Sequence, residues 1–162
     1  MPSEDLQRAM AAVTMSKEEM NRFLSTPRLA RIATIDENGK PHIVPVWYYY
    51  DGTNILVPTM KGTKRARNMQ KNPYVSIVID TVEGKPEDIS YLNAKAIIVE
   101  GKAEIKDDDG GSFAKKMYEI YSGKKSLASP MVQLSVSQPR HILIIKPTKV
   151  ISWDLGKFAS MK

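Results

Sequence analysis

Residues 28–59, RLARIATIDENGKPHIVPVWYYYDGTNILVPT, decide the fold class of this chain. Residues 29–35 are mostly apolar, with Leu29, Ala30, Ile32, Ala33 and Ile35, and this short run before a turn predicts a β-strand. Asn38-Gly39 separates this run from a second one over residues 42–50, and another glycine turn leads into a third over residues 54–59. Asn-Gly between apolar runs is typical of a tight hairpin. The stretch therefore predicts a three-stranded antiparallel meander.

Pro45 lies within the second of these runs and has no N–H for a strand ladder, so it is expected at a sheet edge or at a bulge. Residues 81–90 have the glycine, proline and charged residues of a loop. Gly101 is expected to mark a bulge or a division in the strand that contains it. Four further strands are predicted, at residues 74–80, 91–105, 141–145 and 149–153.

Four helices are predicted, at residues 3–12, 16–24, 63–70 and 112–121. Ser16 and Glu19 form a capping box, and Asn72-Pro73 ends the third helix because the residue before a proline avoids helical backbone angles. Residues 124–138 follow no clear period. Strands that are interrupted by helices, rather than alternating with them, favour a mainly β antiparallel barrel with helical inserts over a doubly wound parallel sheet.

The chain has 162 residues, the length of one domain, with helices predicted in residues 1–25 and the barrel in residues 28–155. It has no cysteine, which excludes disulfides, cysteine zinc sites and a thiol nucleophile. The N-terminus lacks the pattern of a signal peptide, and no window approaches the roughly 18 apolar residues of a membrane span. We therefore expect a soluble protein of the reducing cytoplasm with no membrane partner.

The positive charge is concentrated in residues 61–71, KGTKRARNMQK, which carry five cations and no acid in a chain of net charge +6. These cations crowd the start of a predicted helix, where the helix dipole disfavours positive charge. An anion bound at that turn would reverse this penalty through N–H groups, hydroxyls and cationic side chains. The segment therefore predicts a phosphate site, although an exposed charged face also explains it.

A nucleic-acid partner is disfavoured because the cations cluster at one point rather than along a stripe. The aromatic run over residues 47–50 alternates between two faces of a strand, so only half of it could stack on bases. His42 and His141 are far apart and lack a metal-ligand spacing, so no metal site is expected. No residue is placed well enough to be named a catalytic acid or base. Chemistry would therefore come from a bound cofactor.

The order and spacing of several short motifs resemble the pyridoxamine 5′-phosphate oxidase-like, FMN-binding split-barrel superfamily. The motifs are Leu29-Ala30-Arg31-Ile32-Ala33-Thr34, Asn38-Gly39-Lys40-Pro41-His42, Pro45-Val46-Trp47-Tyr48, Thr63-Lys64-Arg65-Ala66-Arg67-Asn68, Asn72-Pro73-Tyr74-Val75-Ser76 and Gly101-Lys102-Ala103-Glu104. With the C-terminal strands, the resemblance covers residues 16–155. It implies a six-stranded antiparallel split β-barrel of Greek-key type. It also implies a homodimer that holds its cofactor in clefts at the subunit interface and acts on a small molecule.

The resemblance implies that this chain is a flavoprotein oxidoreductase with FMN as its cofactor. The flavin ring would lie along Val46, Trp47 and Tyr48, largely through backbone contacts. The phosphate site and its surroundings would comprise Pro58, Thr59, Lys61, Thr63, Lys64, Arg65 and Asn68. Trp153 would reach the cleft of the partner subunit, although a core position is the more common place for a tryptophan.

Two departures from the superfamily leave the cofactor and the activity open. A vitamin oxidase carries an Arg-x-His-type substrate motif near its C-terminus, whereas this chain has Trp153-Asp154-Leu155-Gly156-Lys157, which argues against pyridoxamine phosphate as its substrate. The Arg65-x-Arg67-Asn68 spacing also resembles the branch that binds the deazaflavin F420, and Lys61, Arg67 and Lys71 would suit the acidic tail of that cofactor. An F420-dependent reductase and a non-enzymatic flavin-binding protein are therefore the alternatives.

Overall fold

The computed structural model describes residues 2–82 and 93–160, with side chains through residue 158. It contains one antiparallel sheet in the order β2-β1-β5-β6-β7-β4-β3. The strands are β1 (Ala30–Ile35), β2 (Pro41–Val46), β3 (Tyr49–Tyr50), β4 (Ile55–Met60), β5 (Tyr74–Thr81), β6 (Lys95–Asp107) and β7 (Arg140–Asp154). The α-helices are α1 (Glu4–Val13), α2 (Lys17–Ser25), α3 (Lys64–Lys71), α4 (Ser112–Ser122) and α5 (Pro130–Ser137). Short 3₁₀ turns cover Asp109–Gly111, Lys124–Ala128 and Leu155–Ser160.

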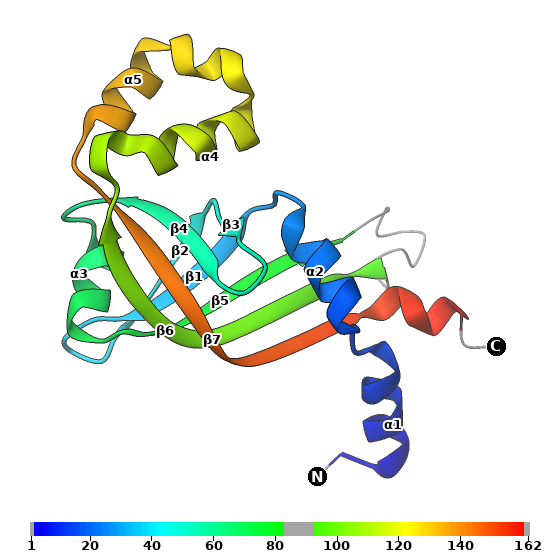
Figure 1. Cartoon of the computed structure of the whole chain (residues 1–162). Helices are drawn as coiled ribbons and strands as arrows, with labels where there is room; N and C mark the ends of the chain where they lie inside the picture. Colours follow the sequence, from blue (N-terminus) through cyan, green and yellow to red (C-terminus); the bar gives the residue numbers. More distant parts are fainter. Residues whose placement is uncertain (1, 83–92, 161–162) are drawn as a thin grey trace.

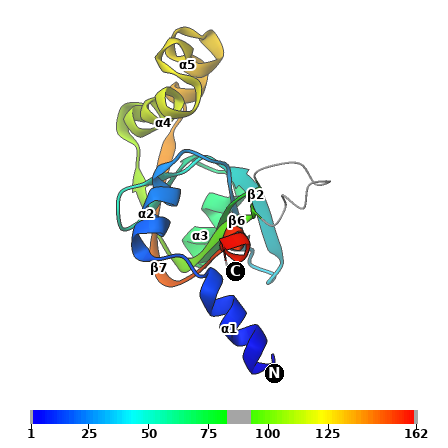
Figure 2. The ribbon, with the colours of Figure 1, turned by 90° about the vertical axis from the view of Figure 1, so that its right-hand side faces the viewer.

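The sheet curls into a half-barrel, as the views in Figures 1 and 2 show. Strands β2 and β3 are the two ends of the strand order, yet only Trp47 and Tyr48 separate them along the chain. Three steps between consecutive Cα atoms span at most roughly 11 Å, so the two sheet edges must approach each other here. The mainly β antiparallel architecture predicted from the sequence is confirmed, and Pro45 lies on the edge strand β2, as expected.

The sheet has seven strands among the described residues, so the expectation of six is wrong. The single strand predicted over residues 42–50 is also wrong, because the chain leaves β2 at Val46 and pairs again only at Tyr49. The aromatic run favours extended backbone, but Trp47 and Tyr48, between β2 and β3, contact α4 and have no strand partner within the described part of the chain. Most of the loop predicted at residues 81–90, and the first residues of the strand predicted to follow it, lie outside the described residues.

The two C-terminal strands predicted at residues 141–145 and 149–153 form one continuous strand, β7, so that division is wrong. The register of β6 and β7 shifts at Glu100/Gly101, which confirms the bulge expected at Gly101. A Cβ atom at Gly101 would lie 2.3 Å from the backbone oxygen of Lys146. Only glycine therefore lets the two strands approach this closely, and the bulge takes up Thr148, which lies between the paired residues Pro147 and Lys149, without ending β7.

The core fills the inside of the curled sheet with alternate residues from most of its strands. Fully buried members are Ile32, Ile55, Val57, Ile77, Ile79, Ile97, Val99, Leu143 and Ile145. Helix α2 adds Phe23 and Leu24 to this core. The predicted capping box is confirmed, because Glu19 N–H donates to Ser16 Oγ (3.2 Å) and Ser16 N–H donates to Glu19 Oε2 (2.6 Å). No helix in the described ranges is long and apolar enough to cross a membrane.

Helices α4 and α5 stand together at one end of the sheet, and α1 lies at the other end (Figures 1 and 2). We call residues 112–137 the helical arm; it includes most of the segment that the sequence pattern left unassigned. Asp108 fixes the start of the arm, since its carboxylate accepts hydrogen bonds from the N–H groups of Phe113 (2.8 Å) and Ala114 (2.9 Å). Gly111 has φ 65°, and a Cβ there would lie 2.3 Å from Val136 O. The arm therefore begins with its two helices in close contact.

Candidate functional site

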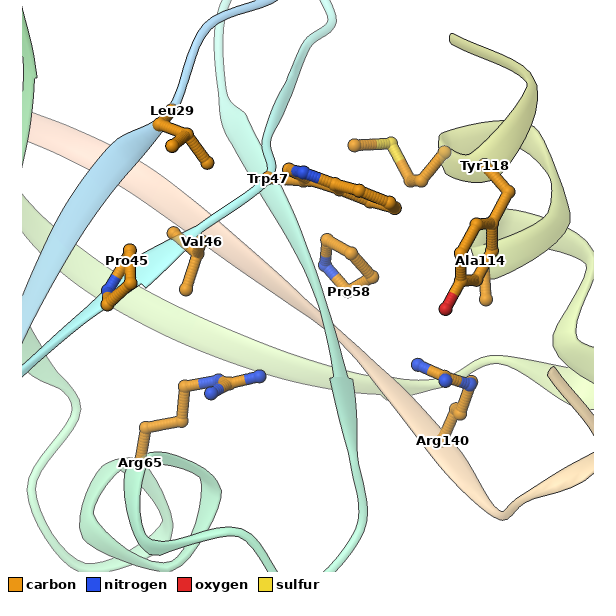
Figure 3. A pocket seen from close by; sticks show the side chains of 10 residues that line it. Leu29, Pro45, Val46, Trp47, Pro58, Arg65, Ala114, Tyr118 and Arg140 are labelled. Carbon is orange, nitrogen blue, oxygen red and sulfur yellow. The ribbon is translucent and has the colours of Figure 1, made fainter. Parts of the chain in front are cut away.

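A pocket of about 340 Å³ opens between the outer face of the sheet, the start of α3 and the helical arm. Figure 3 shows this pocket from close by. The lining is apolar or aromatic except for two arginines. Its residues are Leu29, Pro45, Val46, Trp47, Pro58, Arg65, Ala114, Met117, Tyr118 and Arg140. A pocket with an apolar wall and one strongly cationic side is suited to a ligand that is flat and apolar at one end and anionic at the other.

Arg65 and Arg140 point toward each other below Trp47 and Pro58 (Figure 3). The Nε atom of Arg65 is buried and has no hydrogen-bond partner. Burial lowers the pKa of Arg65, and the positive charge of Arg140 lowers the pKa further. Neither guanidinium forms an ion pair with a carboxylate among the described residues. A bound anion would supply the partner that both cations lack.

The first turn of α3, to which Arg65 belongs, has no side-chain cap. Thr63 is the N-cap residue, but its hydroxyl donates to Met60 O (3.1 Å) and lies 3.0 Å from Thr59 Oγ1. The N–H groups at the start of a helix are available to an anion when no side chain accepts from them. The arrangement therefore adds helix N–H donors to the charge of Arg65.

Trp47 forms the aromatic wall of the pocket and is fixed by the helical arm. Its ring stacks on Tyr121 of α4, with centroids 4.9 Å apart and planes 10° apart. The ring of Tyr118, also on α4, meets Trp47 edge-on at 5.1 Å. Such aromatic contacts add about 0.5–1.5 kcal/mol each beyond the area that they bury. Trp47 is therefore held as a rigid surface.

The residue after Trp47 faces the opposite way. Tyr48 is 3% exposed, and its hydroxyl donates to Thr26 O (3.2 Å). Its backbone N–H donates to the Tyr121 hydroxyl (3.2 Å), and that hydroxyl lies 2.9 Å from both Tyr48 O and Arg28 O. Burial raises the pKa of both tyrosines, so both hydroxyls keep their protons. Tyr121 thus satisfies the backbone groups of Tyr48 that an edge strand would leave free.

The match to the family model described as pyridoxamine 5′-phosphate oxidase extends over residues 16–154 of this chain. The chain belongs to the pyridoxamine 5′-phosphate oxidase family. General stress protein 26 of Bacillus subtilis is 30% identical over 67% of this chain and 74% of its own length. The pyridoxine/pyridoxamine 5′-phosphate oxidase of Citrobacter koseri is 25% identical over 68% of this chain. That match covers 54% of the oxidase, so the chain spans about half its length.

Solved structures of the same fold support this assignment. The conserved hypothetical protein Rv2991 from Mycobacterium tuberculosis has a TM-score of 0.75 at 26% identity, covering 92% of this chain and 91% of that one. An F420 reductase has a TM-score of 0.64 at 24% identity, covering 80% of this chain and 94% of that one. At this identity the likeness indicates a shared fold and nothing about the cofactor of this chain. The resemblance inferred from the sequence motifs is confirmed at the level of the family.

The pocket brings together four of the residues that the family resemblance predicts to bind the cofactor: Val46, Trp47, Pro58 and Arg65. The other expected residues lie elsewhere. Thr59 is 1% exposed and points into the barrel, because the strand period of two places it opposite Pro58. The amide of Asn68 is also buried and donates to Thr34 Oγ1 (2.9 Å). Binding of a cofactor by the four pocket residues stays a prediction.

The remaining expected residues do not line the pocket either. Lys61 forms an ion pair with Asp107 (2.8 Å), and Lys64 forms one with Asp36 (3.3 Å). Thr63 makes the hydroxyl contacts described above. Trp153 is paired with Ala96, near the end of β7 that is opposite to Arg140. The described chain therefore assigns Lys61 and Lys64 to surface ion pairs, and contact of Trp153 with a partner subunit stays untested.

Two pocket residues that the family motifs did not indicate are Arg140 and Tyr118. Arg140 begins β7, and the register places it opposite Met60, immediately before the turn into α3. This pairing brings it to Arg65 from a distant part of the sequence. No local pattern around Gln138-Pro139-Arg140 marks it, so only the strand order could have revealed it. Tyr118 lies in a helix that the sequence predicted, but the sequence did not show which side of that helix would face the pocket, because this depends on how α4 packs.

Proposed function

We propose that this protein is an oxidoreductase that binds FMN in the pocket between Trp47 and Arg65. The observation that carries the proposal is the buried, unpartnered Nε of Arg65 at the uncapped start of α3, next to a rigid aromatic wall. A phosphate monoester carries close to two negative charges and accepts several hydrogen bonds. The pocket residues therefore fit a cofactor that combines a flat ring with a terminal phosphate.

The chain's own residues have separate tasks in this proposal. Arg65 and the first N–H groups of α3 would hold the phosphate, while Val46, Trp47 and Pro58 would orient the ring and exclude water from one side. Bound FMN would supply hydride or electron transfer to a small-molecule substrate. No residue of the described chain is assigned as a catalytic acid or base.

F420 is the second candidate cofactor, and the outer face of α3 favours it. Lys64, Arg67 and Lys71 lie together around the turn that holds Asp36 and Glu37. Three cations against two acids leave a net positive surface beside the helix start. An acidic oligoglutamate tail would find complementary charge there. Lys61 does not contribute to this surface, since it is paired with Asp107 on another side.

Titration of the cofactor-free protein with FMN and, separately, with F420 tests the proposal, with cofactor fluorescence as the readout. We expect FMN to bind with a Kd below about 100 µM, which corresponds to roughly −5.5 kcal/mol. Failure of both cofactors to bind at this level would refute the proposed function. Tight binding of F420 with no binding of FMN would assign the protein to the deazaflavin branch.

Turnover separates an enzyme from a flavin-binding protein that catalyses nothing. The FMN-loaded protein is mixed anaerobically with NADH or NADPH, and the F420-loaded protein is mixed with candidate oxidants after chemical reduction. Loss of the oxidised flavin absorbance in the FMN-loaded protein, or return of the oxidised deazaflavin absorbance in the F420-loaded protein, with a rate constant of about 1–10³ s⁻¹, the usual enzymatic range, would support the oxidoreductase. A cofactor that binds tightly and is neither reduced nor reoxidised by any tested partner would favour the binding protein.

We further propose that the protein works as a homodimer, as the family resemblance implies. Leu29 lines the pocket yet is 53% exposed, and Ile43 on the neighbouring edge strand is 64% exposed. Apolar side chains beside an open pocket favour a second surface that covers them. Light scattering after size-exclusion chromatography should give about twice the mass of the chain, and a monomeric mass at micromolar concentration would contradict the dimer.

A cytoplasmic location stays an expectation from the absence of cysteine.

A further inference from the structure

Arg140 is a buried cation that the helical arm holds in place. Its side chain is 8% exposed. Its Nε and Nη2 atoms donate to the backbone oxygen of Ser135 at 2.9 Å and 2.7 Å, and Nη2 also donates to Ser135 Oγ at 2.5 Å. Ser135 lies in the last turn of α5, where free carbonyl groups and the helix dipole favour a cation. The arm therefore fixes one edge of the guanidinium and leaves Nη1 for another acceptor.

The free side of Arg140 faces Arg65 across the pocket (Figure 3). Within residues 2–82 and 93–158, the hydrogen bonds of Arg140 come from Nε and Nη2 and none comes from Nη1, and Arg65 Nε is buried without a partner. Among the residues that the structure describes, these are the only charged side chains that line the pocket. Two converging cations repel each other, and this repulsion grows in a site that is shielded from water. An anion placed between them removes the repulsion and satisfies both sets of donors.

We propose that Arg65 and Arg140 bind one phosphate monoester group from opposite sides, so that Arg140 is a second phosphate ligand supplied by the start of β7. This inference rests on the proposed function and deepens it, since it specifies the charge of the group that the pocket takes. Two guanidiniums match a dianionic monoester, such as the terminal phosphate of FMN. The phosphodiester of F420 carries a single negative charge and leaves one guanidinium uncompensated. The site thus favours FMN over F420.

The same contacts connect the phosphate to the helical arm. The Tyr118 hydroxyl on α4 donates to Ser135 Oγ (3.1 Å), and the Tyr118 ring rests edge-on against Trp47. Arg140, Ser135, Tyr118 and Trp47 therefore form a continuous path from the anion to the aromatic wall. An anion bound to Nη1 of Arg140 holds this side chain in its contacts with Ser135. It therefore also stabilises the packing of α5 against α4. Ligand binding should consequently protect the arm, whose exposed turn contains Lys124 and Lys125.

The test compares FMN with riboflavin, which lacks the phosphate, in the wild type and in Arg140→Gln. The ratio of the two Kd values isolates the phosphate contribution from that of the ring. We expect Arg140→Gln to reduce the preference for FMN by about tenfold or more while riboflavin affinity changes less than about threefold, because a charge-assisted hydrogen bond is lost. Arg8→Gln is the matched control, since Arg8 is an exposed arginine of α1, which lies at the opposite end of the sheet from the helical arm, and it pairs with Glu4. It should keep the full preference.

A second variant guards against loss of the fold. Arg140→Lys keeps the charge but replaces the planar guanidinium, which reaches Ser135 and the pocket with different edges, by a single nitrogen, so it should lose several-fold of the preference for FMN. Circular dichroism and a thermal melt identify variants that remain folded. If a folded Arg140→Gln or Arg140→Lys protein keeps the wild-type preference for FMN over riboflavin, Arg140 does not bind the phosphate and the proposal is wrong.

Inorganic phosphate separates this proposal from the proposed function. Tryptic cleavage after Lys124 and Lys125 is followed in phosphate and in chloride at the same ionic strength. Phosphate should slow cleavage of the wild type and have no such effect on Arg140→Gln. If no flavin or deazaflavin binds but phosphate still protects the arm through Arg140, the proposed function fails and the anion site stands. If phosphate gives no protection and no cofactor binds, both fail.

Discussion

The two faces of helix α3 differ in how their cations are compensated. On the outer face Lys64 is paired with Asp36 and Lys71 with Glu37. On the inner face Arg65 meets another cation, Arg140, and within the described residues it pairs with no acid. Lys64 and Arg65 are neighbours in the sequence, yet the helix turns them about 100° apart. The difference predicts that the anion-binding residue is the cation without a counter-charge, and that the density of positive charge alone does not mark it.

The largest expected effect is on cofactor affinity when the unpaired cation is removed. Arg65→Gln should weaken FMN binding by about 10- to 150-fold, since one charge-assisted hydrogen bond to a phosphate is worth about 1.5–3 kcal/mol. The neighbouring change Lys64→Gln should alter the Kd by less than about threefold. Fluorescence titration of both variants measures this contrast. Equal losses in the two variants would remove the distinction between the faces.

The next effect concerns the buried amide on the inner side of α3. Asn68→Ala should lower the free energy of unfolding by about 1–3 kcal/mol, because Thr34 Oγ1 loses its donor in the interior. Affinity for FMN should stay within about threefold of the wild type. Urea unfolding gives the stability, and Gln70→Ala on the exposed side of α3 is the control, expected within about 0.5 kcal/mol. A large loss of FMN affinity at unchanged stability would make Asn68 a phosphate ligand instead.

A smaller effect should distinguish the two candidate cofactors on the outer face. The double variant Arg67→Gln, Lys71→Gln removes cations that lie outside the pocket, so the Kd for FMN should change less than about twofold. The Kd for F420 should rise several-fold if the acidic tail uses this surface, since exposed ion pairs contribute about 0.2–1 kcal/mol each. Parallel titrations measure both. Weaker FMN binding in this variant would show that the outer face holds the phosphate.

The smallest expected effect is on how the free energy of unfolding falls at low pH, to which Asp36 on the outer face contributes. Hydrogen bonds from the N–H groups of Lys40 and Asn38, and the charge of Lys64, hold the pKa of Asp36 below its ordinary value. A depressed pKa in the folded state contributes stability above the unfolded value of about 3.9, and this stability is lost as the pH falls. Asp36→Asn should therefore lose less stability than the wild type between pH 5 and pH 3, about the range where this group titrates. Identical pH profiles of urea midpoints would contradict this assignment.

Local sequence signals accounted for much of the fold. The Asn38-Gly39 hairpin, the Ser16 and Glu19 capping box and the Gly101 bulge each depend on neighbours in the chain or on one residue type, and all three were predictable. The break after Val46 was not predictable, because the Tyr121 hydroxyl that binds the backbone of Tyr48 comes from α4. The continuity of β7 through Pro147 likewise depended on its pairing with β6.

The candidate site was only partly predictable for the same reason. The cations crowded at a helix start predicted an anion site at the beginning of α3, but this pattern could not choose between Lys64 and Arg65, whose surroundings depend on where Asp36 and Arg140 lie. Arg140 reaches the site through strand register over a long separation in sequence. Tertiary contacts decide which acid or cation lies next to a charged side chain, and no local sequence pattern contains them. Only the structure could therefore show that Lys64 pairs with Asp36 and that Arg65 lies next to Arg140.

A crystal structure of the wild-type protein grown with FMN tests the central claim most directly. We predict that the flavin phosphate lies between the guanidiniums of Arg65 and Arg140, with the ring beside Trp47. A phosphate on the outer face of α3, near Lys64 and Lys71, would contradict the account. So would a flavin bound away from Trp47 with Arg65 and Arg140 left without an anion.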